Sequence, residues 1–195
     1  MCPEQPDGLA ERLLDYLQLL AKWNRAYNLS AVREPEQMVT RHLLDSLSVL
    51  PYIEGPRLLD IGSGAGLPGI PLALARPDLS VAVLDSNGKK TRFLRQAVLE
   101  LPLTNVEVIE ARVEAYRPEQ PFQTVISRAF ADAAVFFALA RPLAAPQGRL
   151  LAMKGRLDAN EWAKIDAERG KLLTHTVQVP GLDAERHLLH LELST

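Results

Sequence analysis

The stretch LLDIGSGAGLPGIPLAL, residues 58–74, decides how the rest of the chain is interpreted. An apolar run typical of a buried strand is followed at once by a loop rich in glycine. The glycines are Gly62, Gly64, Gly66 and Gly69. Pro68 and Pro71 are tolerated only in the first turn of a helix, so a helix is predicted to begin near Leu67. We interpret the loop as a place where a ligand approaches bare backbone. A tight turn without a ligand is the alternative, but it would weaken the chain with no gain in packing.

Strand-like and helix-like segments alternate after Pro56. Strands are predicted at 57–61, 79–85, 105–111, 122–129 and 148–155, and helices at 88–102, 132–142 and 158–170. This alternation predicts a mostly parallel sheet with helices on both faces, and right-handed crossovers make it a doubly wound, Rossmann-like α/β fold. Two consecutive strand-like runs, 171–179 and 186–193, predict an antiparallel hairpin at the sheet edge.

The first fifty or so residues follow a different pattern. Residues 8–27 carry leucines at helical spacing, and residues 34–50 form a second predicted helix with Pro35 at its favoured first position. We therefore expect an N-terminal helical arm, residues 1–55, attached to an α/β domain, residues 56–195, in one structural unit.

Composition limits the classes of function. The net charge is −2 and the pI about 6.1, so a nucleic-acid partner would require a local basic patch. Cys2 is the single cysteine, which excludes an internal disulfide and a cysteine-based metal site. The sequence contains no signal-peptide pattern and no apolar run of membrane-spanning length. We expect a cytoplasmic protein that needs no metal and no membrane.

Two cofactors compete for the glycine loop. Gly64, Gly66 and Gly69 satisfy the dinucleotide pattern G-x-G-x-x-G, which is weak evidence by itself. Asp60 would lie close to a pyrophosphate and repel it, whereas S-adenosylmethionine carries an ammonium and a sulfonium group. Asp85 ends the second predicted strand and can accept hydrogen bonds from ribose hydroxyls, a feature that both kinds of enzyme share. S-adenosylmethionine is therefore favoured, and a dinucleotide remains a remote alternative.

The sequence also narrows the methyl acceptor. The fourth predicted strand is followed by SRAF, residues 127–130, and not by the Asp/Asn-Pro-Pro-aromatic run typical of exocyclic-amine methylation. The body of the chain has no cysteine nucleophile, which methylation of pyrimidine C5 requires. What remains is an acceptor that is already nucleophilic, such as guanine N7 with its free lone pair, or one that another group deprotonates. For guanine N7, no deprotonation is needed. Catalysis would then rest mainly on alignment of the reactants.

Several longer segments share one resemblance. They are WNRAYNLSA (23–31), RHLLDSL (41–47), LLDIGSGAGLPGIPLAL (58–74), VLDSNGKKTRFLRQ (83–96), NVEVIEARVEAY (105–116), VISRAF (125–130) and MKG (153–155). The chain resembles the glucose-inhibited division protein B family of bacterial 16S rRNA guanine-N7 methyltransferases. The similar segments cover most of the sequence.

This resemblance implies a class I fold, S-adenosylmethionine as cofactor, and methylation of N7 of one guanine in the decoding-region loop of 16S rRNA. The cofactor-binding residues that it implies are Gly62, Gly64, Gly66, Leu67, Asp85, Val113, Glu114 and Arg128. Val113 and Glu114 would flank the adenine. No catalytic side chain is certain, and Arg128 is the candidate. A structural ion pair is the alternative role for Arg128.

Basic residues suggest where RNA binds. The candidates are Lys89, Lys90, Arg92 and Lys154, although a solvated helix face explains the first three equally well. His42 and Asp45 lie on one helix face, where we expect a network between arm and domain. The substrate would be 16S rRNA or the 30S subunit, and the protein a monomer. The alternatives are a small-molecule methyltransferase and an RNA-binding assembly factor without activity.

Overall fold

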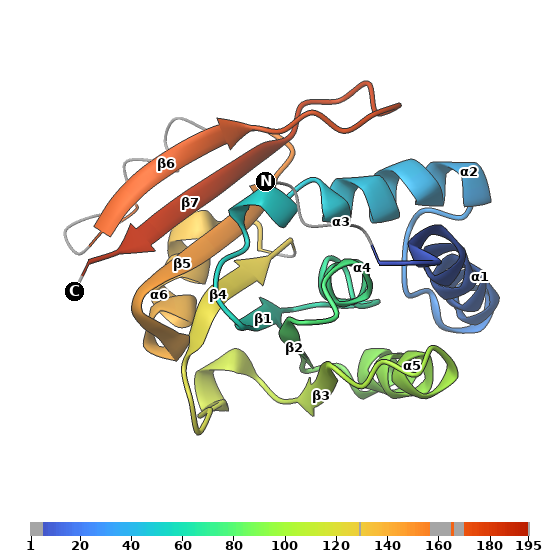
Figure 1. Cartoon of the computed structure of the whole chain (residues 1–195), viewed down its shortest axis with the longest axis horizontal. Helices are drawn as coiled ribbons and strands as arrows, with labels where there is room; N and C mark the ends of the chain where they lie inside the picture. The colour runs from blue at the N-terminus through green and yellow to red at the C-terminus, as the bar shows by residue number, and fades with distance from the viewer. Residues whose placement is uncertain (1–5, 129, 157–164, 166–169, 195) are drawn as a thin grey trace.

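A seven-stranded sheet forms the centre of the computed structural model, which describes residues 6–128, 130–156, 165 and 170–194. The strands follow one another across the sheet in the order β3-β2-β1-β4-β5-β7-β6 (Figure 1). Their bounds are β1 Arg57–Ile61, β2 Ser80–Asp85, β3 Val106–Glu110, β4 Phe122–Ser127, β5 Ala144–Lys154, β6 Gly170–Thr176 and β7 His187–Leu193.

The predicted strand directions are confirmed. Strands β1 to β5 pair in parallel, while β7 pairs antiparallel with both β5 and β6. The hairpin is inserted with its second strand next to β5, so β6 forms the outer edge. Strand β5 begins at Ala144, four residues before the predicted start at 148. The helix predicted over 158–170 falls outside the described residues, apart from Ile165 and from Gly170, which opens β6.

Helices cover both faces of the sheet, as predicted. The helices α4 (Gly69–Ala75) and α5 (Gly88–Glu100) lie on one face, and α6 (Ala133–Ala140) lies on the other (Figure 1). Side chains fix where the last two begin: Asn87 accepts the N–H of Lys89, and Asp132 caps α6 in the same way. Because both faces are covered, successive strand residues such as Leu58 and Leu59 are both fully buried.

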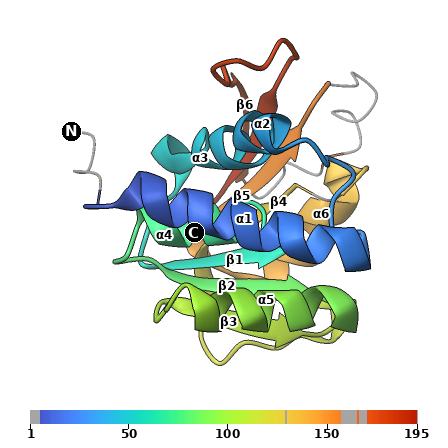
Figure 2. The ribbon, with the colours of Figure 1, turned by 90° about the vertical axis from the view of Figure 1, so that its right-hand side faces the viewer.

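The first helix of the N-terminal arm packs against α4 and α5, and the end of the arm contacts the sheet, where Tyr52 packs on His175 of β6 and Glu54 is hydrogen-bonded to Thr124 of β4. Helix α1 (Leu9–Tyr27) runs alongside α4 and α5 (Figure 2). The predicted second helix is divided into α2 (Pro35–Met38), a π-helical segment η1 (Val39–Leu44) and α3 (Asp45–Leu47). Within the described residues, three short 3₁₀ turns complete the helical segments: η2 Leu50–Tyr52, η3 Val113–Ala115 and η4 Arg141–Leu143.

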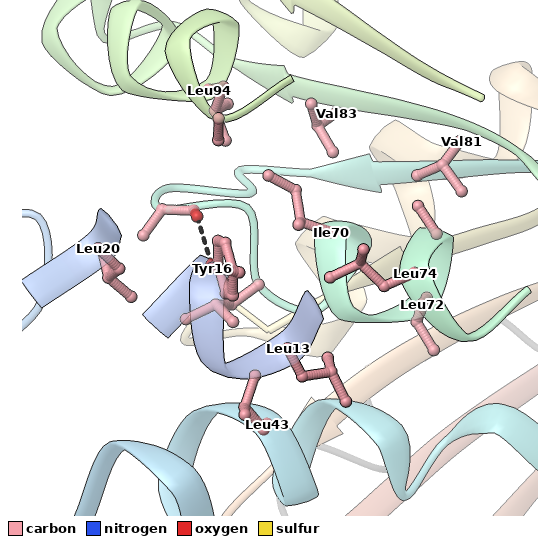
Figure 3. Packing of buried hydrophobic residues seen from close by; sticks show 14 of the residues in the cluster. Leu13, Tyr16, Leu20, Leu43, Ile70, Leu72, Leu74, Val81, Val83 and Leu94 are labelled. Atoms are coloured by element: carbon pink, nitrogen blue, oxygen red, sulfur yellow. Dashed lines mark hydrogen bonds between the residues drawn. The ribbon is translucent and has the colours of Figure 1, made fainter. Parts of the chain in front are cut away.

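The apolar stripe of the arm explains this packing. Tyr16, Leu20 and Leu43 form one buried cluster with Ile70 of α4 and Leu94 of α5 (Figure 3). The arm and the α/β part therefore share one hydrophobic core on this side of the sheet, and burial of these side chains is the main stabilising contribution.

Candidate active site

The glycine-rich loop joins the carboxyl end of β1 to α4. Gly62, Gly64 and Gly66 have φ angles of 69°, 61° and 90°, a region that glycine adopts freely and other residues avoid. The N–H groups of Gly62 and Ser63 donate to the carbonyl of Leu84 at 2.8 and 3.1 Å. These bonds attach the loop to the end of β2 and fix its backbone.

The glycines of this region have two different roles. A Cβ atom on Gly66 would lie 2.6 Å from Cδ1 of Ile70, and one on Gly69 would lie 2.7 Å from Cγ1 of Val83. A Cβ atom on Gly64 would have no neighbour closer than 3.9 Å. Gly66 and Gly69 are therefore required by core packing, contrary to the expectation that the glycines bring no packing gain. Gly64 remains open toward the adjacent cavity.

Asp60 is a structural acid beneath the loop. Its side chain is completely buried, and Oδ2 accepts the N–H of Gly69 at 2.9 Å. Burial raises the pKa of Asp60 to about 7, although the N–H of Gly69 and the positive charge of Arg128 act in the opposite direction. The carboxyl group is shielded from any ligand above the loop. The structure therefore supports a role for Asp60 in holding the start of α4, and not the expected role of facing a positively charged ligand.

Asp85 links the loop to the next helix. Its Oδ2 accepts the N–H of Gly64 at 2.9 Å, and its Oδ1 accepts the N–H of Asn87 at 2.9 Å. The ammonium of Lys90 lies 3.5 Å from Oδ2. A carboxylate offers about four lone-pair directions, so Asp85 retains acceptor capacity for further hydroxyl groups.

Two cavities flank the loop and meet at Gly62. The first, of about 230 Å³, is lined by Gly62, Gly64, Leu67, Lys90 and Arg128, together with residues of the arm. The second, of about 180 Å³, is lined by Asp85, Val113 and Glu114 with apolar neighbours such as Leu84 and Phe130. The structure thus brings seven of the eight implied cofactor residues together, while Gly66 faces the core. Cations in the first cavity suit a carboxylate, and the second suits an adenosine, so the residues fit S-adenosylmethionine.

The arm contributes to the loop through one buried hydrogen bond. The hydroxyl of Tyr16 in α1 donates to the carbonyl of Ala65 at 2.6 Å (Figure 3). The Tyr16 side chain is fully buried, and this burial raises the pKa of its hydroxyl above the ordinary value. This contact could not be predicted, because Tyr16 simply continues the apolar stripe of the helix.

Arg128, which follows β4, forms an ion pair and lines a cavity at the same time. Its Nη1 lies 3.2 Å from Oδ2 of Asp45 in the arm. Arg186, just before β7, donates from Nε to Oδ1 of the same carboxylate at 2.7 Å. The expected network at Asp45 between the arm and the domain is present. Arg186 was missed, since it lies in a loop with no recognisable motif.

The four predicted RNA-binding residues do not form one patch. Lys90 lines the first cavity beside the loop. Lys154, the last residue of β5, donates to the carbonyls of Phe130 and Ala131. Lys89 and Arg92 are exposed on α5. Only Lys154 lies beside Arg128 and Arg186.

The described residues contain neither a metal-binding cluster nor a membrane-spanning helix. Within them, no group of three or more histidine, cysteine, aspartate or glutamate side chains is arranged to hold a metal ion. None of the helices in that part of the chain has the length and apolar character needed to cross a membrane.

Solved structures show which fold this is. The S-adenosylmethionine-dependent methyltransferase SibL covers 94% of this chain and 70% of its own length with a TM-score of 0.66 at 15% identity. The O-methyltransferase from Bacillus cereus, solved in complex with SAH, covers 91% and 90% with a TM-score of 0.65 at 20% identity. These likenesses show the fold. The fold is that of Rossmann-like, S-adenosylmethionine-dependent methyltransferases, and the two cavities suit this cofactor.

Sequence comparison identifies the family. The GidB family, described as rRNA small subunit methyltransferase G, matches residues 9–189. Ribosomal RNA small subunit methyltransferase G of Alkalilimnicola ehrlichii is 59% identical, over 94% of this chain and 84% of that protein. The protein of the same name from Chromohalobacter salexigens is 57% identical, over 93% and 86%. The chain belongs to the GidB family of small-subunit rRNA methyltransferases, which confirms the resemblance found in the sequence.

Proposed function

We propose that the chain transfers the methyl group of S-adenosylmethionine to N7 of one guanine in the decoding-region loop of 16S rRNA. The observation that carries the proposal is the position of Arg128, which lines both the first cavity beside the loop and a neighbouring cavity that contains Asp45 and Arg186. An acceptor that enters from the arginine side would therefore meet the cofactor cavity directly. Loop bases are accessible in this way because they are easily unstacked.

Each cofactor contact keeps the role that the family resemblance implies. Gly62 and Leu67 contact the methionine end, Asp85 binds the ribose hydroxyls, and Val113 and Glu114 flank the adenine. The spare acceptor capacity of Asp85 supports this assignment, because the ribose can bind without breaking the bond to Gly64.

The chemistry asks little of the side chains. When bound, S-adenosylmethionine supplies an electrophilic methyl group on a sulfonium. Guanine N7 carries a free lone pair and no proton, so the N7–CH₃ bond forms as the C–S bond breaks, and no general base is needed. The chain orients the reactants and excludes water. Asp45 neutralises Arg128, which limits repulsion of the positive charge that methylation leaves on the base.

The proposal also covers the form of the substrate, the cellular location, the oligomeric state and the arrangement of arm and domain. We take the substrate to be 16S rRNA, either free or within the 30S subunit, and the enzyme to be a cytoplasmic monomer. The arm, residues 1–55, and the α/β domain, residues 56–195, act as one unit, an arrangement supported by the hydrophobic cluster they share.

The test is methyl transfer from labelled S-adenosylmethionine to 16S rRNA and to 30S subunits from cells that lack the corresponding gene. Strand cleavage specific for N7-methylguanine then maps the product. A single cleaved guanine in the decoding-region loop supports the proposal. Cofactor binding with no label in either RNA contradicts it and favours a small-molecule acceptor or an inactive assembly factor.

Asp85→Asn tests the cofactor assignment separately. We expect the dissociation constant for S-adenosylmethionine to rise about ten- to a hundredfold, because hydrogen bonds to a charged acceptor are worth about 1.5–3 kcal/mol. Asp78→Asn is the matched control, since Asp78 pairs with Arg76 on an exposed turn before β2. Equal affinities of the two variants, measured by calorimetry, would remove Asp85 from the cofactor site.

A further inference from the structure

A cavity of about 340 Å³ lies between the arm and the end of the sheet. Its charged lining residues are Arg41, Asp45, Arg128, Lys154 and Arg186, and we call it the arginine cavity. Among the described residues, four cationic side chains and one carboxylate line the cavity, although the whole chain has a net charge of −2. This local excess of positive charge does not follow from composition. Arg128 and Arg186 share the single negative charge of Asp45, and partial burial of the positive charge that this pair retains favours an anionic ligand.

The geometry at Asp45 prepares two of these cations. Asp45 is buried, and its two oxygens contact Arg186 at 2.7 Å and Arg128 at 3.2 Å. The side chains of both arginines are about one-quarter exposed, at 26% for Arg128 and 25% for Arg186. Each guanidinium has five N–H donors, and the contact with Asp45 uses only some of them. Arginine side chains held in this way lose little further entropy when they bind an anion.

The nature of the anion follows from the position of the cavity. Arg128 forms part of the wall of both the arginine cavity and the cofactor cavity. A phosphate group in the arginine cavity would hold its own nucleotide beside the cofactor. Planar guanidinium groups bind phosphate oxygens in pairs, and such contacts set the register of a strand without reading its sequence.

We propose that the arginine cavity binds a backbone phosphate of the acceptor RNA strand, with Arg186 as its donor and Asp45 as a positioning residue. This inference rests on the proposed function and deepens it. It assigns to Arg186 and Asp45 roles that neither the cofactor site nor the sequence motifs supply.

The experiment measures binding of the full chain to a fluorescent RNA hairpin that carries the decoding-region loop, with saturating S-adenosylhomocysteine, over a series of salt concentrations. Arg186→Gln is compared with Arg76→Gln. Arg76 is a matched control, because it also pairs with an aspartate at 2.7 Å and its side chain is 23% exposed, but it lies after α4 at the opposite end of the strands.

We expect Arg186→Gln to weaken RNA binding about tenfold and to reduce the slope of log K against log salt by about one, as loss of one phosphate contact predicts. Arg76→Gln should change neither quantity. Binding of S-adenosylhomocysteine should be the same in all three proteins, which also verifies that the variants are folded.

Asp45→Asn separates positioning from charge. The variant keeps all four cations and loses the opposing negative charge, so we expect the salt slope not to decrease. We expect its methylation kcat to fall about tenfold, because the two arginines lose their common anchor and the acceptor is misaligned. A variant with normal kcat would show that Asp45 does not position the arginines.

Three outcomes overturn the inference. If Arg186→Gln binds RNA like Arg76→Gln, the cavity does not hold a phosphate of the strand. If Arg186→Gln weakens S-adenosylhomocysteine binding and leaves the RNA salt slope unchanged, the cavity serves the cofactor carboxylate. If the unaltered chain neither binds nor methylates RNA, the proposed function fails and this inference fails with it. Normal methylation by Arg186→Gln overturns only the phosphate site.

Discussion

The glycine-rich loop and the arginine cavity lie side by side at the end of the sheet, but they are built in different ways. The loop occupies five consecutive residues, 62–66, and is held mainly by the adjacent strand β2 through Leu84 and Asp85. The arginine cavity takes its charged residues from the arm, from the ends of β4 and β5, and from the segment before β7. A contiguous motif therefore makes the loop, whereas the arginine cavity depends on tertiary assembly.

The largest expected effect on stability concerns Asp60, the buried acid beneath the glycine-rich loop. Because burial raises its pKa to about 7, the native state binds a proton more tightly than the unfolded chain does. This group's contribution to stability is therefore greatest at low pH and is lost as the pH rises from about 4 to about 7. Between these limits the loss amounts to as much as about 4 kcal/mol.

Urea unfolding of the wild type and of Asp60→Asn, measured between pH 4.5 and 8, tests this expectation. The variant has no titrating group at this position and should show a flatter dependence of the free energy of unfolding on pH. If the two proteins have parallel pH profiles, Asp60 titrates normally, and the loop is not supported by a buried acid.

Much of the fold was predictable because it depends on local patterns. Alternating strand-like and helix-like segments predicted the parallel sheet, and two consecutive strands predicted the hairpin. The insertion of β7 between β5 and β6 was not predictable, since both hairpin strands are similarly apolar. The π-helical segment at 39–44 interrupts a sequence that has ordinary helical spacing, so it too escaped prediction.

The site residues also differ in whether a local motif predicts them. Gly62, Leu67 and Asp85 lie in or directly after motifs that the sequence displays, and the structure places them around two adjoining cavities. Arg186 has no local signal, because its significance comes only from its contact with Asp45, far away in the chain. The packing role of Gly66 was also hidden, since it depends on the side chain of Ile70 pressing against it.

Alanine substitutions at two glycines would break the loop in two distinct ways. Gly66→Ala places a Cβ atom 2.6 Å from Ile70 at a φ of 90°, so we expect the free energy of unfolding to fall by about 3 kcal/mol. Gly64→Ala meets no close neighbour at a φ of 61° and should lose only about 1 kcal/mol.

Chemical denaturation measures both variants, and calorimetry with S-adenosylhomocysteine measures the consequence for the cofactor. Gly64→Ala should weaken cofactor binding despite its mild effect on stability, because the new methyl group faces the cavity. Equal losses of stability at the two positions would contradict the division of the glycines into packing and ligand-facing roles.

The smallest expected effect tests whether the loop is as self-sufficient as its contiguous motif indicates. Tyr16→Phe removes the hydrogen bond from α1 to the carbonyl of Ala65, which should lower the free energy of unfolding by about 1 kcal/mol. Tyr27→Phe is the matched control, because it deletes the same atom from a side chain that is 40% exposed. If Tyr16→Phe also weakens binding of S-adenosylhomocysteine, the arm holds the loop in its binding conformation, and both regions depend on the arm. If only stability falls, the loop keeps its own shape, and only the arginine cavity requires the arm for function.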